Sequence, residues 1–409
     1  MFIRLIFICV ILFFIELYAF QAIKTLVRNK AVLWTYVAIS AVLFVYILYH
    51  LSKFDRKVGQ THDSMTTMGL FLIVFVPKML IGFVLFGEDL YRMVMGGVNF
   101  FVDYSDRDTF LPERRRFVSQ AALGLAAIPL GSLIYGIFKG KYNYKVIRTE
   151  IGFPDLPPAF DGLRILQISD VHSGSFDDPE KIEYAIDLIN QQEADIFLFT
   201  GDIVNTFATE MHPWLETFKK IKEYPLGKFA VLGNHDYGEY LDWDSVDAKA
   251  KNFEDIKQLY GDMGCKLLLN EHVFVNRGDD KIAVVGVENW GKQFKKAGDL
   301  ALAAKGLTAA DFKILMSHDP SHWQYQVKDS AQHFQLTLSG HTHGMQFGIE
   351  IPGWIKWSPV QFVYKQWAGL YEHLGRYVYV NRGFGFHAYP GRVGIWPEIS
   401  VITLRSAKR

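Results

Sequence analysis

Residues 165–172 read ILQISDVH, an apolar run that stops at the carboxylate of Asp170 and the imidazole of His172. The run is short and follows the segment PPAFDG at residues 157–162, a pattern typical of a buried strand in an α/β or sandwich core. Side chains at positions i and i+2 of a strand end point the same way, so Asp170 and His172 are placed to hold one metal ion between them. The same pattern also fits a capping or turn aspartate beside an ordinary histidine.

The composition of the chain is uneven along its length. Its 409 residues allow two or more domains, and the mean hydropathy of +0.09 averages a lipid-like first third with an ordinary soluble remainder. A formal net charge of zero and a pI of about 7.2 give no general attraction to nucleic acid, so no such partner is expected. Only Cys9 and Cys265 are present, and their separate settings predict no internal disulfide.

The N-terminal region contains four stretches that are long and apolar enough to cross a bilayer, which needs about 20 helical residues. Buried core helices normally have a polar face, and these stretches scarcely do. Glu16 and Lys78 are the only charges well inside them, and we expect this pair to face the bundle interior and join its helices. The sequence predicts an all-α transmembrane region over residues 1–140, with spans near residues 2–23, 31–51, 65–86 and 118–138.

The orientation in the membrane is less clear, because the Lys and Arg residues of the loops divide evenly between the two sides. The run RRRFV at residues 114–118, placed before an Ala- and Gly-rich span, resembles a twin-arginine export signal, although a plain basic flank explains it equally well. We expect an integral protein of the bacterial cytoplasmic membrane with its C-terminal domain on the outer face. The cytoplasmic face stays open as the alternative.

Residues 141–162 are expected to form a polar linker and domain entry, followed by one soluble domain over residues 163–409. Residues 266–269, 272–276 and 281–287 of that domain are expected to be strands of a second sheet.

Four more apolar runs of the domain end at polar side chains. The runs at residues 194–200, 227–232, 311–317 and 334–339 end, in this order, in Gly201-Asp202, Gly233-Asn234-His235-Asp236, His318 and Gly340-His341-Thr342-His343.

All these polar groups therefore follow the C-terminal ends of predicted strands, which is the edge where α/β sheets build their sites. Together they offer carboxylates, an amide and imidazoles, ligand types suited to hard or borderline divalent metals. The five fragments resemble, block for block, the signature of the calcineurin-like metallophosphoesterases: Asp-x-His, Gly-Asp, Gly-Asn-His, His and Gly-His-x-His. The resemblance covers residues 163–404 and implies a four-layer α/β/β/α sandwich.

The resemblance also implies roles for individual residues. Two divalent ions, of manganese, iron or zinc, would deprotonate a bridging water, and the resulting hydroxide would attack phosphorus. His235 would stabilise the transition state or protonate the leaving oxygen, and Asp236 would orient His235. Asp202 would bridge the ions, because two nearby cations need a shared anionic ligand. The implied ligands are Asp170, His172, Asp202 and His343 for one ion, and Asp202, Asn234, His318 and His341 for the other.

The chain departs from the protein-phosphatase branch of the family, because Gly201-Asp202 is followed by Ile-Val-Asn-Thr rather than by Asp-Arg-Gly. It is more similar to the small membrane-attached bacterial branch, although glycine is usual there at the position of Met345. That likeness implies a membrane-anchored phosphoesterase acting on phosphodiesters, including lipid or cell-envelope substrates. Three alternatives stay open: a pyrophosphatase for nucleotide- or lipid-linked sugars, a catalytically silent scaffold or sensor, and a transport role for the spans.

The segment between Met345 and Trp396 is rich in aromatic residues. A loop that packs on itself is the simpler interpretation, and a rim that touches the bilayer through residues such as Trp354 and Trp357 is the alternative. Arg382 or Arg392 would then clamp a substrate phosphate. Four histidines of the soluble part that match no block are interpreted as structural or exposed: His212, His322, His333 and His387.

Overall fold

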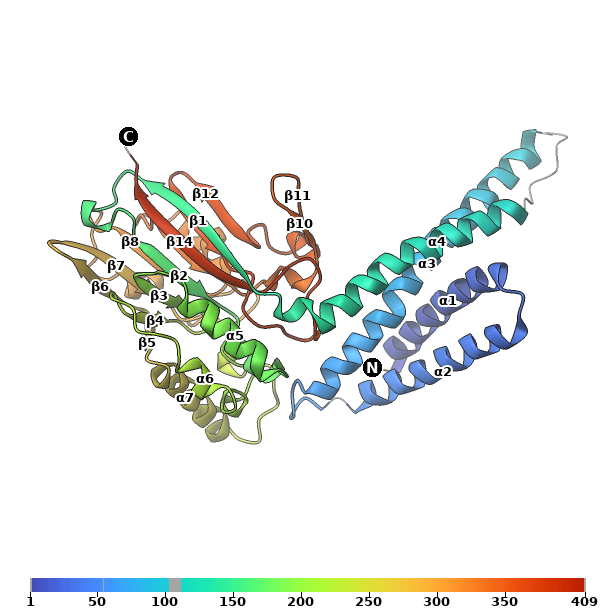
Figure 1. The fold of residues 1–409 in the computed structure, drawn as a ribbon, viewed down its shortest axis with the longest axis horizontal. Coiled ribbons are helices and arrows are strands. Elements are labelled where there is room, and N and C mark those ends of the chain that lie inside the picture. Colours follow the sequence, from blue (N-terminus) through green and yellow to red (C-terminus); the bar gives the residue numbers. More distant parts are fainter. Residues whose placement is uncertain (1, 54, 103–111, 408–409) are drawn as a thin grey trace. The chain divides into compact units, whose positions relative to one another are not determined.

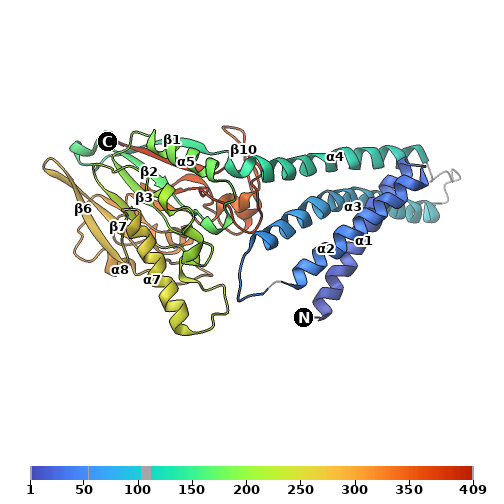
Figure 2. The same cartoon turned by 60° about the horizontal axis from the view of Figure 1, so that its bottom comes forward.

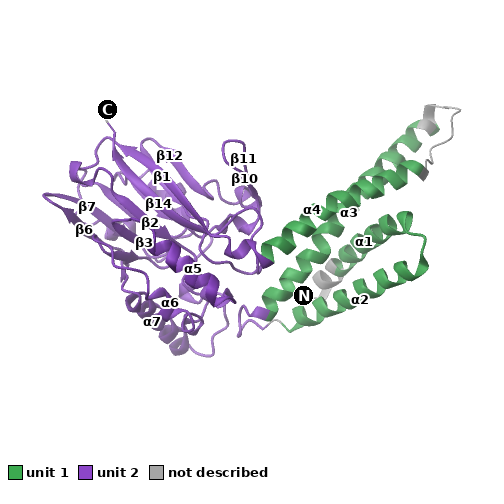
Figure 3. Cartoon of the chain, viewed as in Figure 1, with its two compact units in different colours: residues 1–54, 63–137 green, residues 55–62, 138–409 purple. Residues whose placement is uncertain are grey.

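The computed structural model describes residues 2–53, 55–102 and 112–407. The chain forms two compact units (Figures 1 and 3). The first unit comprises residues 1–54 and 63–137, and the second comprises residues 55–62 and 138–409. The short segment 55–62, which connects two helices of the first unit, thus belongs to the second.

The described part of the first unit consists of four helices, and each is long and apolar enough to cross a membrane. The prediction of an all-α region of about four apolar helices is therefore confirmed. The third helix is much longer than the expected span, with 41 residues, and it carries Pro77 in its interior. At about 1.5 Å per residue it exceeds the roughly 30 Å of a hydrocarbon core. The helices are α1 (Phe2–Leu26), α2 (Lys30–Ser52), α3 (His62–Val102) and α4 (Pro112–Phe138).

Small residues and a few buried charges join the helices of the first unit. Ala19 and Ala22 of α1 pack with Ala122 and Ala126 of α4, and small side chains of this kind let helix backbones approach closely. Lys78 Nζ donates to Glu16 Oε2 over 2.7 Å, so the two intramembrane charges are paired. At α4, Arg115 contacts carboxylates of α3, Glu88 at 2.7 Å and Asp89 at 2.8 Å.

The second unit is built on two six-stranded sheets (Figures 1 and 2). The first sheet has the order β1-β14-β2-β3-β4-β5 and the second has the order β12-β13-β9-β8-β7-β6, while β10 and β11 form a separate ribbon. The strands of the first sheet are β1 (Lys145–Phe153), β2 (Arg164–Ile168), β3 (Ile196–Phe199), β4 (Lys228–Ala230), β5 (Lys266–Leu267) and β14 (Glu398–Ser406). Those of the second are β6 (Glu271–Arg277), β7 (Asp280–Gly286), β8 (Lys313–Met316), β9 (Leu336–Ser339), β12 (Gly369–His373) and β13 (Arg376–Val380). The separate ribbon is β10 (Ile349–Ile351) and β11 (Ile355–Trp357).

The two sheets pack face to face through an apolar core that includes Ile165 and Leu198 of the first sheet and Ile314 and Leu336 of the second. Helices cover the outer faces. Those of the first sheet's side are α5 (Pro179–Asn190), α6 (Leu215–Phe218) and α7 (Val246–Asp262) (Figure 1). Those beside the second sheet are α8 (Leu300–Ala303), α9 (Pro320–His322) and a π-helical turn (Trp323–Val327). The predicted four-layer α/β/β/α sandwich is confirmed.

The strands that carry the predicted site run parallel and in register. Ile168 of β2 lies opposite Phe199 of β3, and Phe199 lies opposite Ala230 of β4. In the second sheet β8 and β9 are likewise parallel. Every residue of β3, β8 and β9 is buried, as expected for strands covered on both faces. The loops after these strands therefore begin at one edge of the sandwich.

Two local expectations are wrong. Residues 145–153, expected to be part of a linker, form the edge strand β1, which pairs in parallel with β14 along its length. Only Ile151 and Phe153 of β1 are buried, so the strand shows little of the hydrophobic alternation that would reveal it. Residues 266–267 belong to the first sheet, where they pair with β4, and not to the second. With two residues, β5 is too short to carry a pattern.

Candidate metal centre

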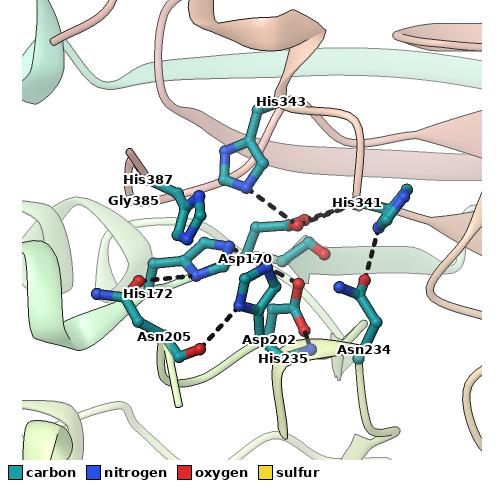
Figure 4. Close-up of polar contacts among 12 residues, drawn as sticks. Asp170, His172, Asp202, Asn205, Asn234, His235, His341, His343, Gly385 and His387 are labelled. Atoms are coloured by element: carbon teal, nitrogen blue, oxygen red, sulfur yellow. Dashed lines mark hydrogen bonds and ion pairs between the residues drawn. The ribbon is translucent and has the colours of Figure 1, made fainter. Parts of the chain in front are cut away.

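The loops after β2, β3, β4, β8 and β9 bring their side chains together at one edge of the sandwich. Asp170 and Asp202 lie between a group of imidazoles on one side and His341 with Asn234 on the other (Figure 4). All the residues that the sequence predicts as ligands come together there, and nearly all of them are buried. These residues are Asp170, His172, Asp202, Asn234, His318, His341 and His343.

The backbone of this edge is strained where it presents its side chains. Non-glycine residues rarely take a positive φ, and each instance costs on the order of 1–3 kcal/mol. The surrounding loops are packed too closely to relax. A Cβ on Gly340 would lie 1.9 Å from Ser169 Oγ, and a Cβ on Gly201 would lie 2.4 Å from Gly233 N. Five of the predicted ligands have a positive φ: Asp170 (54°), His172 (47°), Asp202 (59°), His341 (71°) and His343 (49°).

The donor atoms of the predicted ligands gather in two clusters, and a third group within the same 4.8 Å limit joins His172 and Asp202 to His235. In the first, the ligand atoms of Asp170, His172 and His343 lie within 4.8 Å of one another, and His343 Nε2 is 3.2 Å from Asp170 Oδ1. In the second, Asp202 joins His318 and His341 under the same limit, and His318 Nε2 is 3.1 Å from Asp202 Oδ2.

Asp202 also reaches the first cluster, because its Oδ2 lies 3.7 Å from His172 Nε2. Asn234 Oδ1 belongs to the second cluster, 2.7 Å from His341 Nδ1 and 3.1 Å from His318 Nε2. The two clusters are thus adjacent and share a carboxylate, Asp202.

The outer ring nitrogens show that these side chains suit a cation. His318 Nδ1 lies 2.7 Å from the carbonyl oxygen of Thr200, which only accepts, so the proton of a neutral ring sits on Nδ1 and Nε2 keeps its lone pair. His172 Nδ1 is held in the same way by Asn205 Oδ1 at 3.1 Å. His343 differs, because its Nδ1 lies 3.0 Å from the donor Nη2 of Arg392, while its buried Nε2 faces Asp170 Oδ1 at 3.2 Å. This donor set fits divalent metal ions.

Electrostatics within the cluster are dominated by burial and by mutual charge effects. Burial alone would raise the pKa of Asp170, but the imidazoles of His343 and His318 outweigh it and lower the pKa. Burial opposes a charged His318, yet Asp202 and Asp170 raise its pKa to about 10. The pKa of His172 is lowered well below its usual value by burial and by His235. Without a bound cation the centre thus keeps Asp170 ionised, His172 neutral and His318 protonated, and a metal ion at His318 Nε2 would displace that proton.

His235 is half-buried beside the centre. Its backbone N–H donates to Asp202 Oδ1 over 2.8 Å, and its Nδ1 lies 2.8 Å from the carbonyl oxygen of Asn205. Among the described residues, no hydrogen bond joins Asp236 to this ring. The buried carboxylate of Asp236 instead accepts from backbone N–H groups, including that of Asp202 at 3.0 Å. The prediction that Asp236 orients His235 is wrong, because the Asn205 carbonyl occupies that position.

The two arginines expected to clamp a substrate phosphate have other partners. Arg382 forms ion pairs with Glu350 and Glu398 and is 6% exposed. Arg392 is fully buried and donates to the carbonyl oxygens of Gly383 and Gly385, close to His343. Both guanidinium groups are used inside the fold, so the prediction of a substrate clamp is corrected.

Sequence reasoning missed residues that lie around the centre. Asn205 contacts both His172 and His235, and Tyr364 Oη lies 2.7 Å from His341 Nε2. His387, interpreted as structural or exposed, has its ring 4.9 Å from that of His172 and 4.6 Å from that of His235 (Figure 4). The sequence signal that could have placed His387 near the centre is the Gly-Phe-Gly run at residues 383–385. Glycine is needed there because the chain passes close to the loop after β2, and a Cβ on Gly385 would lie 1.8 Å from Val171 O.

Comparison with known proteins agrees with this geometry. The family model "Calcineurin-like phosphoesterase" matches residues 163–345. The "Uncharacterized metallophosphoesterase YkuE" of Bacillus subtilis is 30% identical over 299 residues, covering 72% of this chain and 98% of that protein. The chain belongs to the calcineurin-like metallophosphoesterases.

The N-terminal helices of this metallophosphoesterase also have relatives. A model described as "Probable Calcineurin-like phosphoesterase, transmembrane domain" matches residues 3–141. An "Uncharacterized metallophosphoesterase" of Helicobacter pylori strain 26695 is 24% identical over 96% of both chains. A "Transmembrane protein with metallophosphoesterase domain" of Danio rerio is 28% identical over 67% of this chain and 60% of its own length. The metallophosphoesterase is therefore integrated in a membrane.

Proposed function

We propose that this metallophosphoesterase hydrolyses phosphodiesters at a centre of two divalent metal ions. The observation that carries the proposal is the pair of adjacent donor clusters that share Asp202. A shared carboxylate is what two neighbouring cations require, because it offsets their mutual repulsion. The proposed ligands are Asp170, His172, Asp202 and His343 for one ion, and Asp202, Asn234, His318 and His341 for the other.

When bound, the ions supply Lewis acid chemistry that activates a water and polarises the phosphoryl oxygens. The chain supplies the proton for the leaving group. Hydrolysis forms a bond from the water oxygen to phosphorus and breaks the bond to the leaving oxygen, which takes up a proton. The Asn205 carbonyl holds the Nδ1–H of His235, so Nε2 of the protonated ring is the atom that donates. His235 is half-buried and therefore accessible to substrate.

Lipid-linked phosphodiesters are the proposed substrate class. Support comes from the segment 345–363, in which large apolar side chains are exposed, including Trp354 at 77% and Phe362 at 81%. Clustered exposed apolar residues mark interaction surfaces, and Trp is favoured at membrane interfaces. The segment is next to the centre, because Tyr364 contacts His341 and Ser358 Oγ donates to Gly344 O over 2.7 Å. The last membrane helix also ends at Phe138, immediately before the catalytic unit.

We further propose that the catalytic unit faces the outer side of the membrane. The run RRRFV at residues 114–118 is the only support for this, and the ion pairs of Arg115 with Glu88 and Asp89 also suit a purely structural role. Two separate fusions after Arg409, one with alkaline phosphatase and one with green fluorescent protein, test the proposal. We expect an active phosphatase fusion and a non-fluorescent green fluorescent protein fusion. The reverse pattern would place the unit in the cytoplasm.

The test of catalysis uses the full-length protein in detergent, stripped of metal and reloaded with manganese, iron or zinc. We expect metal-dependent turnover of bis(4-nitrophenyl) phosphate that exceeds turnover of 4-nitrophenyl phosphate. Asp202→Asn and His235→Ala should abolish it, and His212→Ala, at an exposed histidine outside the centre, should not. Faster hydrolysis of the monoester than of the diester would overturn the assignment as a phosphodiesterase. Absence of turnover of both substrates with both ions bound would overturn the assignment as an enzyme.

The substrate class has its own test. Trp354→Ala combined with Trp357→Ala should lower turnover of a phosphodiester lipid in vesicles and leave turnover of the soluble diester unchanged. Phe274→Ala, at an exposed aromatic residue on β6 in the second sheet, is the matched control. An equal loss on both substrates would sink the lipid assignment.

A further inference from the structure

The loop that connects α2 and α3 is docked on the catalytic unit. Lys57 Nζ pairs with Asp244 Oδ1 at 2.8 Å, and the backbone N–H of Asp242 donates to the carbonyl oxygen of Arg56. Gly59 packs so closely that a Cβ there would lie 2.8 Å from a methyl carbon of Leu241. The ion pair is exposed and screened by solvent, so it contributes little specificity.

One side chain of this loop reaches the rim of the metal centre. Gln60 Nε2 donates to Ser175 Oγ over 3.1 Å, and Gln60 Oε1 accepts from the backbone N–H of Ala388 over 2.8 Å. The amide thus uses a donor and an acceptor at once, which a carboxylate cannot do. Its two partners lie more than a hundred residues away in sequence and on two different loops.

The Ser175 end leads to the histidines of the centre. Ser175 Oγ is bonded to the side-chain amide of Asn205, with Asn205 Nδ2 donating over 3.1 Å. Asn205 in turn holds His172 Nδ1 with its side-chain oxygen and His235 Nδ1 with its backbone oxygen. A continuous chain of hydrogen bonds therefore runs from Gln60 to a proposed ligand and to the proposed proton donor.

The Ala388 end leads to the same two rings. Ala388 has a positive φ of 60°, which a non-glycine residue adopts only where its surroundings hold it. The bond from Gln60 is one such constraint. The preceding residue, His387, lies against the rings of both His172 and His235. The two ends of the Gln60 amide therefore converge on one pair of imidazoles.

We propose that Gln60 is a positioning residue that completes the metal centre from the loop between two membrane helices. This proposal rests on the proposed function. It extends the site beyond residues 163–345, the region that the phosphoesterase family model matches. By this proposal residues 138–409 alone are an incomplete enzyme, because they lack the residue that holds Ser175 and Ala388. Loss of the Gln60 bonds should loosen His172 as a ligand and His235 as a proton donor.

The test compares Gln60→Met with Lys57→Ala in the full-length protein. Gln60→Met keeps the length of the side chain and removes both hydrogen bonds, whereas Lys57→Ala removes an exposed contact of the same loop. Outer-sphere changes at metal sites typically cost about 10–100-fold in affinity or activity. We expect Gln60→Met to weaken Mn²⁺ binding by about tenfold or more, measured by electron paramagnetic resonance, and Lys57→Ala to have no effect.

A second readout separates positioning from a general loss of structure. At saturating metal, Gln60→Met should lower kcat for a diester with an alkyl leaving group by about tenfold or more and leave KM unchanged, because a poor leaving group needs the proton from His235. The 4-nitrophenyl diester, whose leaving group needs little protonation, should be nearly unaffected. Gln60→Glu, which keeps only the acceptor for Ala388, should lie between wild type and Gln60→Met.

Three results would overturn the proposal: unchanged Mn²⁺ affinity in Gln60→Met, equal losses on the two diesters, or an equal effect of Lys57→Ala. Failure of the proposed function is distinguishable from these. In that case the wild-type protein itself turns over neither diester, and the Mn²⁺ comparison between Gln60→Met and Lys57→Ala still decides whether Gln60 positions the ligands.

Discussion

Arg382 offers a direct test of whether a buried charge serves the fold or the substrate. Its guanidinium pairs with Glu398, which is fully buried, and with Glu350, whose side chain is 23% exposed. Arg382→Ala would leave Glu398 without a counter-charge, although Tyr379 Oη and Ser400 Oγ still donate to it over 2.6 Å. Removing one partner of a buried ion pair costs about 3–5 kcal/mol.

That free energy converts into a measurable shift. For a domain of this size 1 kcal/mol moves the melting temperature by about 2–4 °C, so Arg382→Ala should lower it by about 6–20 °C. The assay is tryptophan fluorescence during heating of the full-length protein in detergent. Arg382→Met combined with Glu398→Gln removes both charges together and should restore most of the lost stability, since well-packed neutral residues often replace a buried pair without cost. A substrate clamp would behave differently: Arg382→Ala would leave the melting temperature unchanged and raise KM, and that outcome would refute the structural role.

Three further outcomes are expected. Burial lowers the pKa of His322 from 6.5 to about 4; the unfolded chain then binds more protons between these values, so stability falls by up to about 3 kcal/mol as the pH drops from 6.5 to 4. His322→Gln should flatten this dependence of the melting temperature, and an unchanged slope contradicts the argument. Burial also raises the pKa of the Cys265 thiol to about 12, so a thiol reagent at pH 8 should modify it in a Cys9→Ser background only after unfolding; rapid reaction of the native protein would show that the thiol is accessible. Asn205→Ala should weaken metal binding by about 10–100-fold through His172; Asn252→Ala, at a partner of the neighbouring Thr206 and Ala208 backbone, is the control, and equal effects would argue against a specific role.

The sequence was informative wherever chemistry follows directly after a buried strand. Asp170, Asp202 and His318 each come just after a run of apolar residues that is buried on both faces, so their common location follows from strand register within each sheet and from the packing of the two sheets. The same reasoning gave the sandwich and the four membrane helices. Strand β1 was missed because an edge strand with only two buried residues has no such signal.

Residues whose role depends on distant partners could not be predicted in this way. The carboxylate partners of Arg382 are 16 and 32 residues away, and nothing local to the arginine reveals them. Asp236 is adjacent to His235 in sequence, but the turn directs its carboxylate to backbone N–H groups instead. Gln60 lies in a loop between two membrane helices, where no pattern points to a metal centre more than a hundred residues later.

The left-handed backbone of the five strained residues among the proposed ligands affects how variants of this metallophosphoesterase should be chosen. Asp, Asn and His tolerate that conformation better than most residues, and glycine adopts it freely. Asp202→Asn therefore removes the carboxylate charge and keeps the turn, whereas Asp202→Ala would add a backbone penalty to the loss of the proposed ligand. An inactive alanine variant at Asp170, His172 or His341 is ambiguous for the same reason. The side-chain types that coordinate metals are also the types this backbone accepts, so the Asp-x-His and Gly-His-x-His blocks specify a chain geometry as well as a set of donors.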